Sequence, residues 1–311
     1  MQKLIYISSC VPEGGVAVYG FDGDRLEKRG FMHIGRAMYT ALDGDTLHCV
    51  AMEADSLRSF AASARIDIPG ASFGSRIPLG LESCFIDARG GDFYTADYSS
   101  SSITKNGTVT VTHEGCGTDP ERQEAAHPHQ SLITPDGRFV AVCDLGLDRV
   151  FVYDRDLNEI SHADVPHGHG VRHLVFAPDG RRAFSINELA CSITEFEFDN
   201  GNITALRTMT PRRCRVKSYG GAIRISPDGK LLFASVRGDN VICVYSVTPD
   251  GTVPLREFGC GGDFPRDFAL CGDRLIIANE RSGNICVTDL YGRKISGTEL
   301  PAPLCVTVRE A

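Results

Sequence analysis

The stretch HPHQSLITPDGRFVAVCDLG, residues 127–146, contains an apolar run, a Pro-Asp-Gly turn and a second apolar run. Two short apolar runs joined by such a turn predict a β-hairpin. The stretch VRHLVFAPDGRRAFSINEL, residues 171–189, repeats this design. In an antiparallel hairpin, the start of the first strand and the end of the second lie at one edge. We therefore expect the polar residues at these ends to gather at one edge, away from the turns.

Turns of this kind recur along the whole chain, in steps of 43 to 49 residues. They fall at Asp43-Gly44, Gly90-Gly91, Asp136-Gly137, Asp179-Gly180, Asp228-Gly229 and Gly272-Asp273. Each hairpin is followed by two more strand-like runs, such as SITEFEFD and ITALRTM after Glu188. Four strands in every 40–50 residues or so are typical of a β-propeller blade.

Six such units cover roughly residues 36–300, and both chain ends supply further strands. The N-terminus contains KLIYISS, GVAVYGF and RLEKRGF, and the C-terminus contains LCVTVRE. Together these four runs complete a seventh blade, which removes open sheet edges. We therefore predict an all-β fold, a seven-bladed β-propeller of four-stranded antiparallel blades in one domain, residues 1–311. A β-helix or a pair of β-sandwiches is the alternative, although the period is too long for most β-helices.

The composition is that of a soluble globular protein, and the formal net charge of −8 disfavours nucleic acid and anionic membranes as partners. The first ten residues read as a strand rather than a signal peptide, and no run is long enough to span a membrane. Twelve scattered cysteines form no Cys-x-x-Cys pair, which favours a reducing compartment. We therefore expect a cytoplasmic protein, a monomer or weak homo-oligomer.

The open ends of the hairpins carry mostly charged side chains. The predicted pairs are Arg36 with Glu53, Glu82 with Asp97, His129 with Asp144, Arg172 with Glu188, Gly221 with Arg237, and Arg266 with Glu280. In a propeller these ends share one face with the connections between blades, so we expect a ring of charge of both signs near the axis. Such a face is where a rigid scaffold places a binding site. For any single pair, an ion pair that bridges two blades is an equally good interpretation.

At these residues the chain resembles the seven-bladed propeller lactonase family, which includes bacterial 6-phosphogluconolactonases and fungal carboxymuconate lactonizing enzymes. The resemblance is strongest over residues 127–153, 170–189, 220–245 and 263–287. It implies a lactonase of carbohydrate metabolism that hydrolyses a sugar lactone, phosphorylated or not, without a cofactor or a metal. The expected partner is a small anionic lactone or acid.

The resemblance also implies catalytic residues, because the lactonizing members are thought to use a histidine, two arginines and a glutamate. These functions fall on His129, Arg172, Glu188 and Arg237. Either Glu188 or His129 would activate water, and the other would orient the water or protonate the leaving alkoxide. Arg172 and Arg237 would bind an anionic group or the developing oxyanion.

Four more residues are candidates for substrate binding. They are Arg266, His173, His127 and Asp144. Two other functions stay open: a carboxymuconate-type lactonizing enzyme, and a non-catalytic propeller that binds a small anion or a protein partner. An enzyme should present a concave polar pocket, whereas a scaffold should present an exposed apolar or mixed patch.

Three further motifs are weaker. The run 70–74 matches a nucleophile-elbow pattern but lacks the strand before it and the helix after it. The pairs His127/His129 and His167/His169 could ligate a metal, but a histidine is as often a hydrogen-bonded scaffold residue. The basic run of Arg212, Arg213, Arg215 and Lys217 could attract anions, although a solvated loop is the simpler interpretation.

Overall fold

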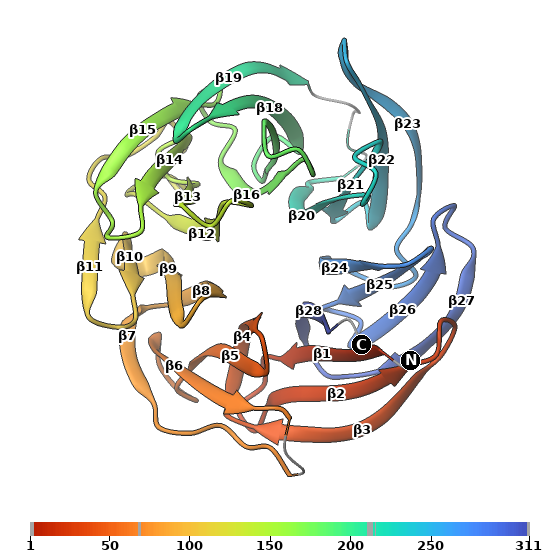
Figure 1. Cartoon of the computed structure of the whole chain (residues 1–311). Helices are drawn as coiled ribbons and strands as arrows, with labels where there is room; N and C mark the ends of the chain where they lie inside the picture. Colours follow the sequence, from red (N-terminus) through yellow and green to blue (C-terminus); the bar gives the residue numbers. More distant parts are fainter. Residues whose placement is uncertain (1–2, 68–69, 210–213, 215, 310–311) are drawn as a thin grey trace.

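Twenty-eight strands lie in the part of the chain that the structure describes. The computed structural model describes residues 3–67, 70–209, 214 and 216–309. Within these ranges the strands form seven four-stranded antiparallel sheets, which stand as blades around a central axis (Figure 1). The predicted seven-bladed β-propeller is therefore confirmed. One 3-10 turn, η1 (Tyr98–Ser100), is the only helical element in the described ranges.

Blades 1 to 3 follow one another in chain order from the innermost strand to the outermost. Blade 1 contains β4 (Arg36–Asp43), β5 (Thr46–Met52), β6 (Arg58–Arg65) and β7 (Ile77–Leu81). Blade 2 contains β8 (Ser83–Arg89), β9 (Asp92–Asp97), β10 (Ser102–Lys105) and β11 (Val109–Thr112). Blade 3 contains β12 (Pro128–Ile133), β13 (Phe139–Asp144), β14 (Arg149–Asp154) and β15 (Glu159–Asp164).

Blades 4 to 6 repeat the same order. Blade 4 contains β16 (Val171–Phe176), β17 (Arg182–Asn187), β18 (Ser192–Asp199) and β19 (Asn202–Met209). Blade 5 contains β20 (Tyr219–Ile225), β21 (Leu231–Arg237), β22 (Val241–Thr248) and β23 (Gly251–Gly259). Blade 6 contains β24 (Pro265–Cys271), β25 (Arg274–Asn279), β26 (Asn284–Asp289) and β27 (Lys294–Glu299).

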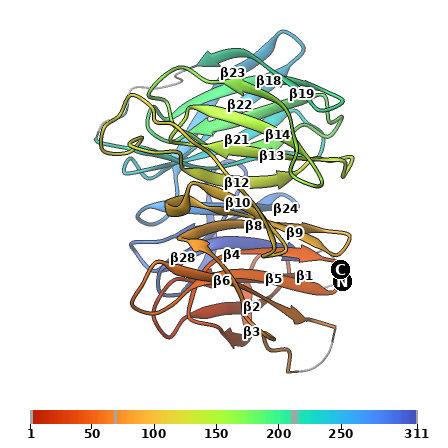
Figure 2. The ribbon, with the colours of Figure 1, turned by 90° about the vertical axis from the view of Figure 1, so that its left-hand side faces the viewer.

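Blade 7 joins the two ends of the chain, as the terminal runs predict. It contains β28 (Pro303–Arg309), β1 (Lys3–Ser9), β2 (Gly15–Phe21) and β3 (Leu26–His33). The innermost strand β28 pairs with β1, so the ring is closed by hydrogen bonds between strands from opposite ends of the sequence. The two ends lie side by side in both views (Figures 1 and 2). This pairing covers the edge of β1 that would otherwise be open.

The blades pack face to face through apolar side chains, and fully buried aromatic residues such as Phe184, Phe233 and Phe268 lie in this packing. Around the hub, a side-chain oxygen of one blade accepts a hydrogen bond from a backbone N–H of the next blade. Gln130 Oε1 accepts Leu174 N, and Asp267 Oδ2 accepts Val306 N, at 2.5 and 2.9 Å. These bonds satisfy backbone groups at the inner edges of the sheets, which would otherwise be buried without a partner.

The innermost strand of every blade contains a β-bulge at the same height. In blades 3, 4 and 6 the extra residues are His129, Arg172 and Arg266. The equivalent positions in the other blades are Met38, Cys84, Gly221-Ala222 and Leu304-Cys305. A bulge leaves its extra residue outside the ladder and re-aims its side chain. The bulges therefore place one residue of each blade around the hub.

The bulges correct the predicted pairing at the hairpin ends. Asp144 lies opposite Pro128 rather than His129, and Asn187 rather than Glu188 lies opposite Val171. The pairing predicted from the sequence assumed two regular strands. At this point, however, each inner strand has one residue more than the strand beside it. His129 and Arg172 consequently have no direct cross-strand partner.

Candidate active site

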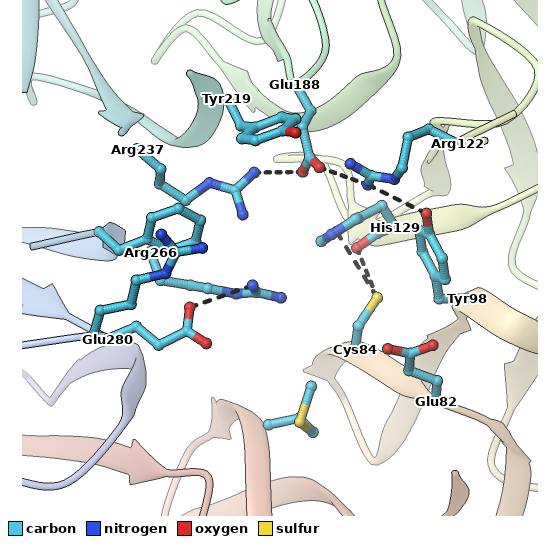
Figure 3. Close-up of a pocket in the computed structure, with 13 residues that line it drawn as sticks. Glu82, Cys84, Tyr98, Arg122, His129, Glu188, Tyr219, Arg237, Arg266 and Glu280 are labelled. Atoms are coloured by element: carbon cyan, nitrogen blue, oxygen red, sulfur yellow. Dashed lines mark hydrogen bonds and ion pairs between the residues drawn. The ribbon is translucent and has the colours of Figure 1, made fainter. Parts of the chain in front are cut away.

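A cavity of about 490 Å³ opens at the hub, on the face that carries the open hairpin ends (Figure 3). Its lining residues come from six blades and from the connections between them. They are Met38, Glu82, Cys84, Tyr98, Arg122, His129, Glu188, Tyr219, Arg237, Phe264, Arg266, Glu280 and Arg281. The cavity is thus concave and charged, as expected for an enzyme rather than a scaffold.

The carboxylate of Glu188 is the centre of an arginine cluster. It follows β17 and is buried, with three guanidinium groups around it. Arg237 Nη2 lies 2.5 Å and Arg172 Nε lies 3.0 Å from Oε2, while Arg122 Nη2 lies 2.7 Å from Oε1. Burial alone would raise the pKa of Glu188, but the arginines outweigh it and hold this pKa well below its ordinary value. Glu188 is therefore ionised and a weak base.

Arg122 belongs to the connection between β11 and β12, residues 113–127, which reaches over the cavity. The buried Gln123 fixes this connection, because its Oε1 accepts Thr118 N and Asp119 N and its Nε2 donates to Leu145 O. Arg122 Nη2 also donates to Tyr98 Oη at 3.4 Å. Burial opposes the charge of Arg122, yet Glu188 raises its pKa. The guanidinium is therefore a permanent cation at the wall of the cavity.

His129 projects from the bulge of β12 onto the floor of the cavity. Its ring lies edge-on to Tyr98, 5.8 Å between centroids, and its Nδ1 lies 3.8 Å from Cys84 Sγ. Burial, and next Arg172, lower the pKa of His129 well below its ordinary value of 6.5. The imidazole is therefore neutral at pH 7. In the described part of the chain, no side chain bonds to its Nε2.

A second cluster lies on the blade 6 side of the cavity. Arg266, the bulge residue of β24, contacts Glu280 at 3.4 Å. Phe264 packs beneath two guanidinium groups, those of Arg237 and Arg281, at 5.2 and 3.7 Å from its ring centroid. The lining thus contains four arginines and three glutamates. The fifth arginine, Arg172, adds positive charge below the floor, in a chain whose net charge is −8.

Four of the predicted site residues line the same cavity: His129, Glu188, Arg237 and Arg266. Arg172 is buried one layer below, where its Nη1 donates to Gly221 O at 2.9 Å. It lines a small enclosed space with His173 rather than the open cavity. Burial and the neighbouring Arg237 lower the pKa of Arg172 to about 9, so it remains a cation at neutral pH. Arg172 therefore does not line the cavity itself, but it contacts Glu188, which does.

Three of the predicted substrate-binding residues do not line the cavity. His173 is buried edge-on to Phe85, 5.4 Å between ring centroids. His127 stacks on Tyr98 at 4.2 Å. Asp144 is fully buried, accepts His127 N, and lies 2.5 Å from His113 Nδ1. His173 instead lies beside Arg172 in the small enclosed space, Asp144 is engaged by His127 and His113, and the ring of Tyr98 stacks on His127. Substrate contact by these three residues stays a prediction.

The remaining motifs lie away from the cavity or outside the description. Glu53, expected in the ring of charge, instead contacts Arg76 at 2.9 Å, away from the hub cavity. Arg212, Arg213 and Arg215 lie outside the described residues. No helix follows the elbow-like run at 70–74 in the described chain. His169 Nδ1 bonds to Ser192 Oγ at 2.8 Å, and the described ranges contain no group of three or more His, Cys, Asp or Glu side chains that could hold a metal.

Several lining residues were not predicted from the sequence. Tyr98, Arg122, Phe264 and Arg281 lie in or beside connections, whereas Tyr219 lies opposite Arg237 at the open end of the β20–β21 hairpin, where Gly221 was predicted. The one available signal for Arg122 is length, because the 113–127 connection is longer than the other connections between blades. Over the described part of the chain, no helix is long and apolar enough to cross a membrane.

The fold and the cavity define the class: a seven-bladed propeller with an arginine-rich pocket at its hub. A family model described as "Lactonase, 7-bladed beta-propeller" matches residues 4–301, so the chain belongs to this family. The resemblance found in the sequence is confirmed.

The solved structures show the same architecture. A Lactobacillus plantarum protein is 30% identical, with a TM-score of 0.90 and complete coverage of both chains. The Pseudomonas aeruginosa periplasmic gluconolactonase PpgL is 24% identical, with a TM-score of 0.87, over 100% of this chain and 99% of that one; this likeness shows the fold.

An uncharacterized Lactococcus lactis protein is 39% identical over 57% of this chain. The chain spans 55% of that relative's length, little more than half.

Proposed function

We propose that this protein hydrolyses the lactone of a sugar acid, as a 6-phosphogluconolactonase-like enzyme. The observation that carries the proposal is the meeting of a neutral imidazole and a cluster of cations at one cavity. His129 supplies the imidazole from blade 3, while Arg122 and Arg237 are held on either side by Glu188. Hydrolysis of a lactone needs a base for water and positive charge for the oxyanion.

Of the two residues expected to activate water, we assign the base to His129, because Glu188 is held in three ion pairs and His129 is in none within the described chain. The Glu188 carboxylate is engaged by three guanidinium groups, which lower its pKa and its proton affinity. His129 is neutral and lines the cavity, and no side chain of the described chain bonds to its Nε2. With the proton on Nδ1, facing Cys84 Sγ, Nε2 accepts a proton from water. The charge of Glu188 then favours the imidazolium that forms.

The reaction follows from these positions. The water oxygen bonds to the lactone carbonyl carbon as its proton passes to His129 Nε2. The carbonyl oxygen becomes an oxyanion beside Arg237, whose Nε and Nη2 are occupied by Gly220 O while Nη1 has no bonded partner in the described chain. The bond between the carbonyl carbon and the ring oxygen then breaks. The imidazolium returns its proton to that oxygen, which leaves as the hydroxyl of the open acid.

The cavity charge supports an acidic ligand. Arginine binds carboxylate and phosphate through a planar fork of donors. The excess of arginine over glutamate in and under this cavity contrasts with the negative net charge of the whole chain. Such a local field attracts anions and raises their local concentration.

The proposal is tested by acid release at pH 7 from 6-phosphogluconolactone and from plain gluconolactone. Each rate is compared with a blank that contains no protein, because these lactones also open spontaneously. We expect the protein to accelerate opening of at least one lactone well above the blank. Rates equal to the blank for both substrates would reject the proposal.

A further inference from the structure

Arg281 differs from the other arginines of the cavity. Arg122, Arg172 and Arg237 each contact Glu188, and Arg266 contacts Glu280. In the described chain, no carboxylate lies within ion-pair distance of Arg281. Its guanidinium lies instead on the ring of Phe264, 3.7 Å from the centroid, at the exposed side of the cavity. The cavity therefore has one cation at its mouth whose charge no neighbouring carboxylate neutralises.

The ring beneath Arg281 is held rigidly. Phe264 is buried and its backbone has a φ of 67°, in the left-handed region that is unfavourable for a bulky residue. Two hydrogen bonds hold it there: Phe264 N donates to Asn240 Oδ1 at 2.8 Å, and Glu280 N donates to Phe264 O at 3.0 Å. Strained backbone of this kind persists where surrounding contacts fix it, often at ligand sites. Arg281 thus lies on a platform fixed before any ligand arrives.

The Phe264 ring also limits the distance between the guanidinium groups of Arg237 and Arg281. Arg237 and Arg281 lie 5.2 and 3.7 Å from the same ring centroid, so their guanidinium carbons are at most 8.9 Å apart, the total of the two. Arg237 is the arginine that faces the reacting carbonyl in the proposed reaction. A single sugar-acid lactone could therefore place its carbonyl at Arg237 and a second anionic group at Arg281.

We infer that Arg281, presented on Phe264, determines specificity for lactones with a second anionic group remote from the ring carbonyl. This inference rests on the proposed function and deepens it. The second group is a phosphate or a carboxylate, since a free guanidinium fork binds both. An arginine that contacts this remote group contributes to substrate binding and leaves the hydrolysis of an uncharged sugar lactone unchanged.

The test compares kcat/KM for 6-phosphogluconolactone and gluconolactone in the wild type, Arg281→Ala and Arg281→Lys. We expect Arg281→Ala to lower kcat/KM for 6-phosphogluconolactone at least about tenfold, because KM rises. The kcat/KM of the same variant for gluconolactone should stay within about twofold of the wild-type value. Arg281→Lys should recover part of the loss. The matched control is Arg138→Ala, because Arg138 lies 5.0 Å over Phe139 at a turn on the opposite face. Equal losses on both lactones, or no loss, would overturn the inference.

Binding of the open acids separates this inference from the proposed function. Calorimetry would compare 6-phosphogluconate, glucarate, which carries a second carboxylate, and gluconate. We expect the wild type to bind one of the first two at least about tenfold more tightly than gluconate, and Arg281→Ala to lose that preference; the preferred acid identifies the anionic group. If the wild type opens no lactone but shows this binding preference, and Arg281→Ala loses it, the proposed hydrolysis is rejected and the role of Arg281 is kept. Equal affinities for all three acids reject the role of Arg281.

Discussion

Glu188 Oε1 and Arg122 Nη2 lie 2.7 Å apart, although 66 positions separate the two residues in the chain. Glu188 follows a strand of blade 4, whereas Arg122 comes from the connection that enters blade 3. The contact closes the wall of the cavity and leaves each guanidinium of the cluster with a fixed orientation.

Arg122→Ala should weaken catalysis without unfolding the protein. About a third of the Arg122 side chain is exposed, so its loss leaves little buried charge unpaired. Removal of one of the cations that line the cavity should weaken the positive field at the oxyanion and lower kcat/KM roughly 10- to 100-fold, in the range seen for single stabilising donors. The control is Arg149→Ala, whose similarly exposed arginine contacts Asp164 at 2.6 Å, far from the cavity. Full activity of the Arg122 variant would contradict the role.

Glu188→Gln should destabilise the protein. The amide cannot balance Arg172 and Arg237, which are both buried, and an unpaired buried charge costs about 3–5 kcal/mol. The folded-state pKa of Glu188 lies below its ordinary value of 4.5, so the carboxylate stabilises the fold above about pH 4.5. This contribution is lost as the pH falls toward the folded-state pKa.

Urea unfolding at several pH values measures this effect. The difference in unfolding free energy between wild type and Glu188→Gln should be largest near pH 6 to 7 and should shrink below about pH 4.5. A difference that stays constant from pH 7 to pH 3 would show that the carboxylate is not ionised in the cluster.

The pH profile of the reaction should lack an acid limb near pH 6.5. Burial, together with Arg172, keeps the imidazole of His129 neutral well below the ordinary value of 6.5. Blank-corrected kcat/KM should therefore remain flat from about pH 7.5 down to about pH 6 and fall only at lower pH. A midpoint at or above pH 6.5 would contradict a neutral, buried base.

Asp267→Ala should destabilise the junction between blades 6 and 7. Asp267 is buried, accepts Arg224 Nη2 at 2.6 Å through Oδ1, and accepts Val306 N at 2.9 Å through Oδ2. Its removal leaves a guanidinium and a backbone N–H unpaired at the hub, at a cost of about 3–5 kcal/mol. The exposed Asp273→Ala should change stability by less than about 1 kcal/mol in the same urea experiment. Equal stabilities of the two variants would contradict this role.

The architecture could be predicted from the sequence because it is repetitive. Each Pro-Asp-Gly turn marks one hairpin; Gly137, Gly180 and Gly229 all have positive φ there, as such turns require. The regular step between turns then gives the number of blades. The strands at the two ends of the chain had no complete blade of their own, which indicated the closed ring that β28 and β1 form.

The site could be predicted only in part, for two physical reasons. Hairpin ends recur with the repeat, so His129, Glu188 and Arg237 were found at one face. The spacing between hairpin ends does not reveal the extra residue of a bulge, so its effect on Arg172 and Asp144 was not visible. Arg122 and Arg281 lie beside irregular connections, whose path depends on contacts such as those of Gln123 and Asn240.

The most direct test of the proposed chemistry is the initial rate of acid release from 6-phosphogluconolactone and gluconolactone by wild type, His129→Ala and Glu188→Gln. Circular dichroism first establishes that both variants are folded under the assay conditions. We expect a wild-type rate well above the blank, and at least about a 100-fold loss in kcat for His129→Ala. Wild-type activity of the folded His129→Ala variant, or a wild-type rate equal to the blank on both lactones, would contradict the proposed chemistry.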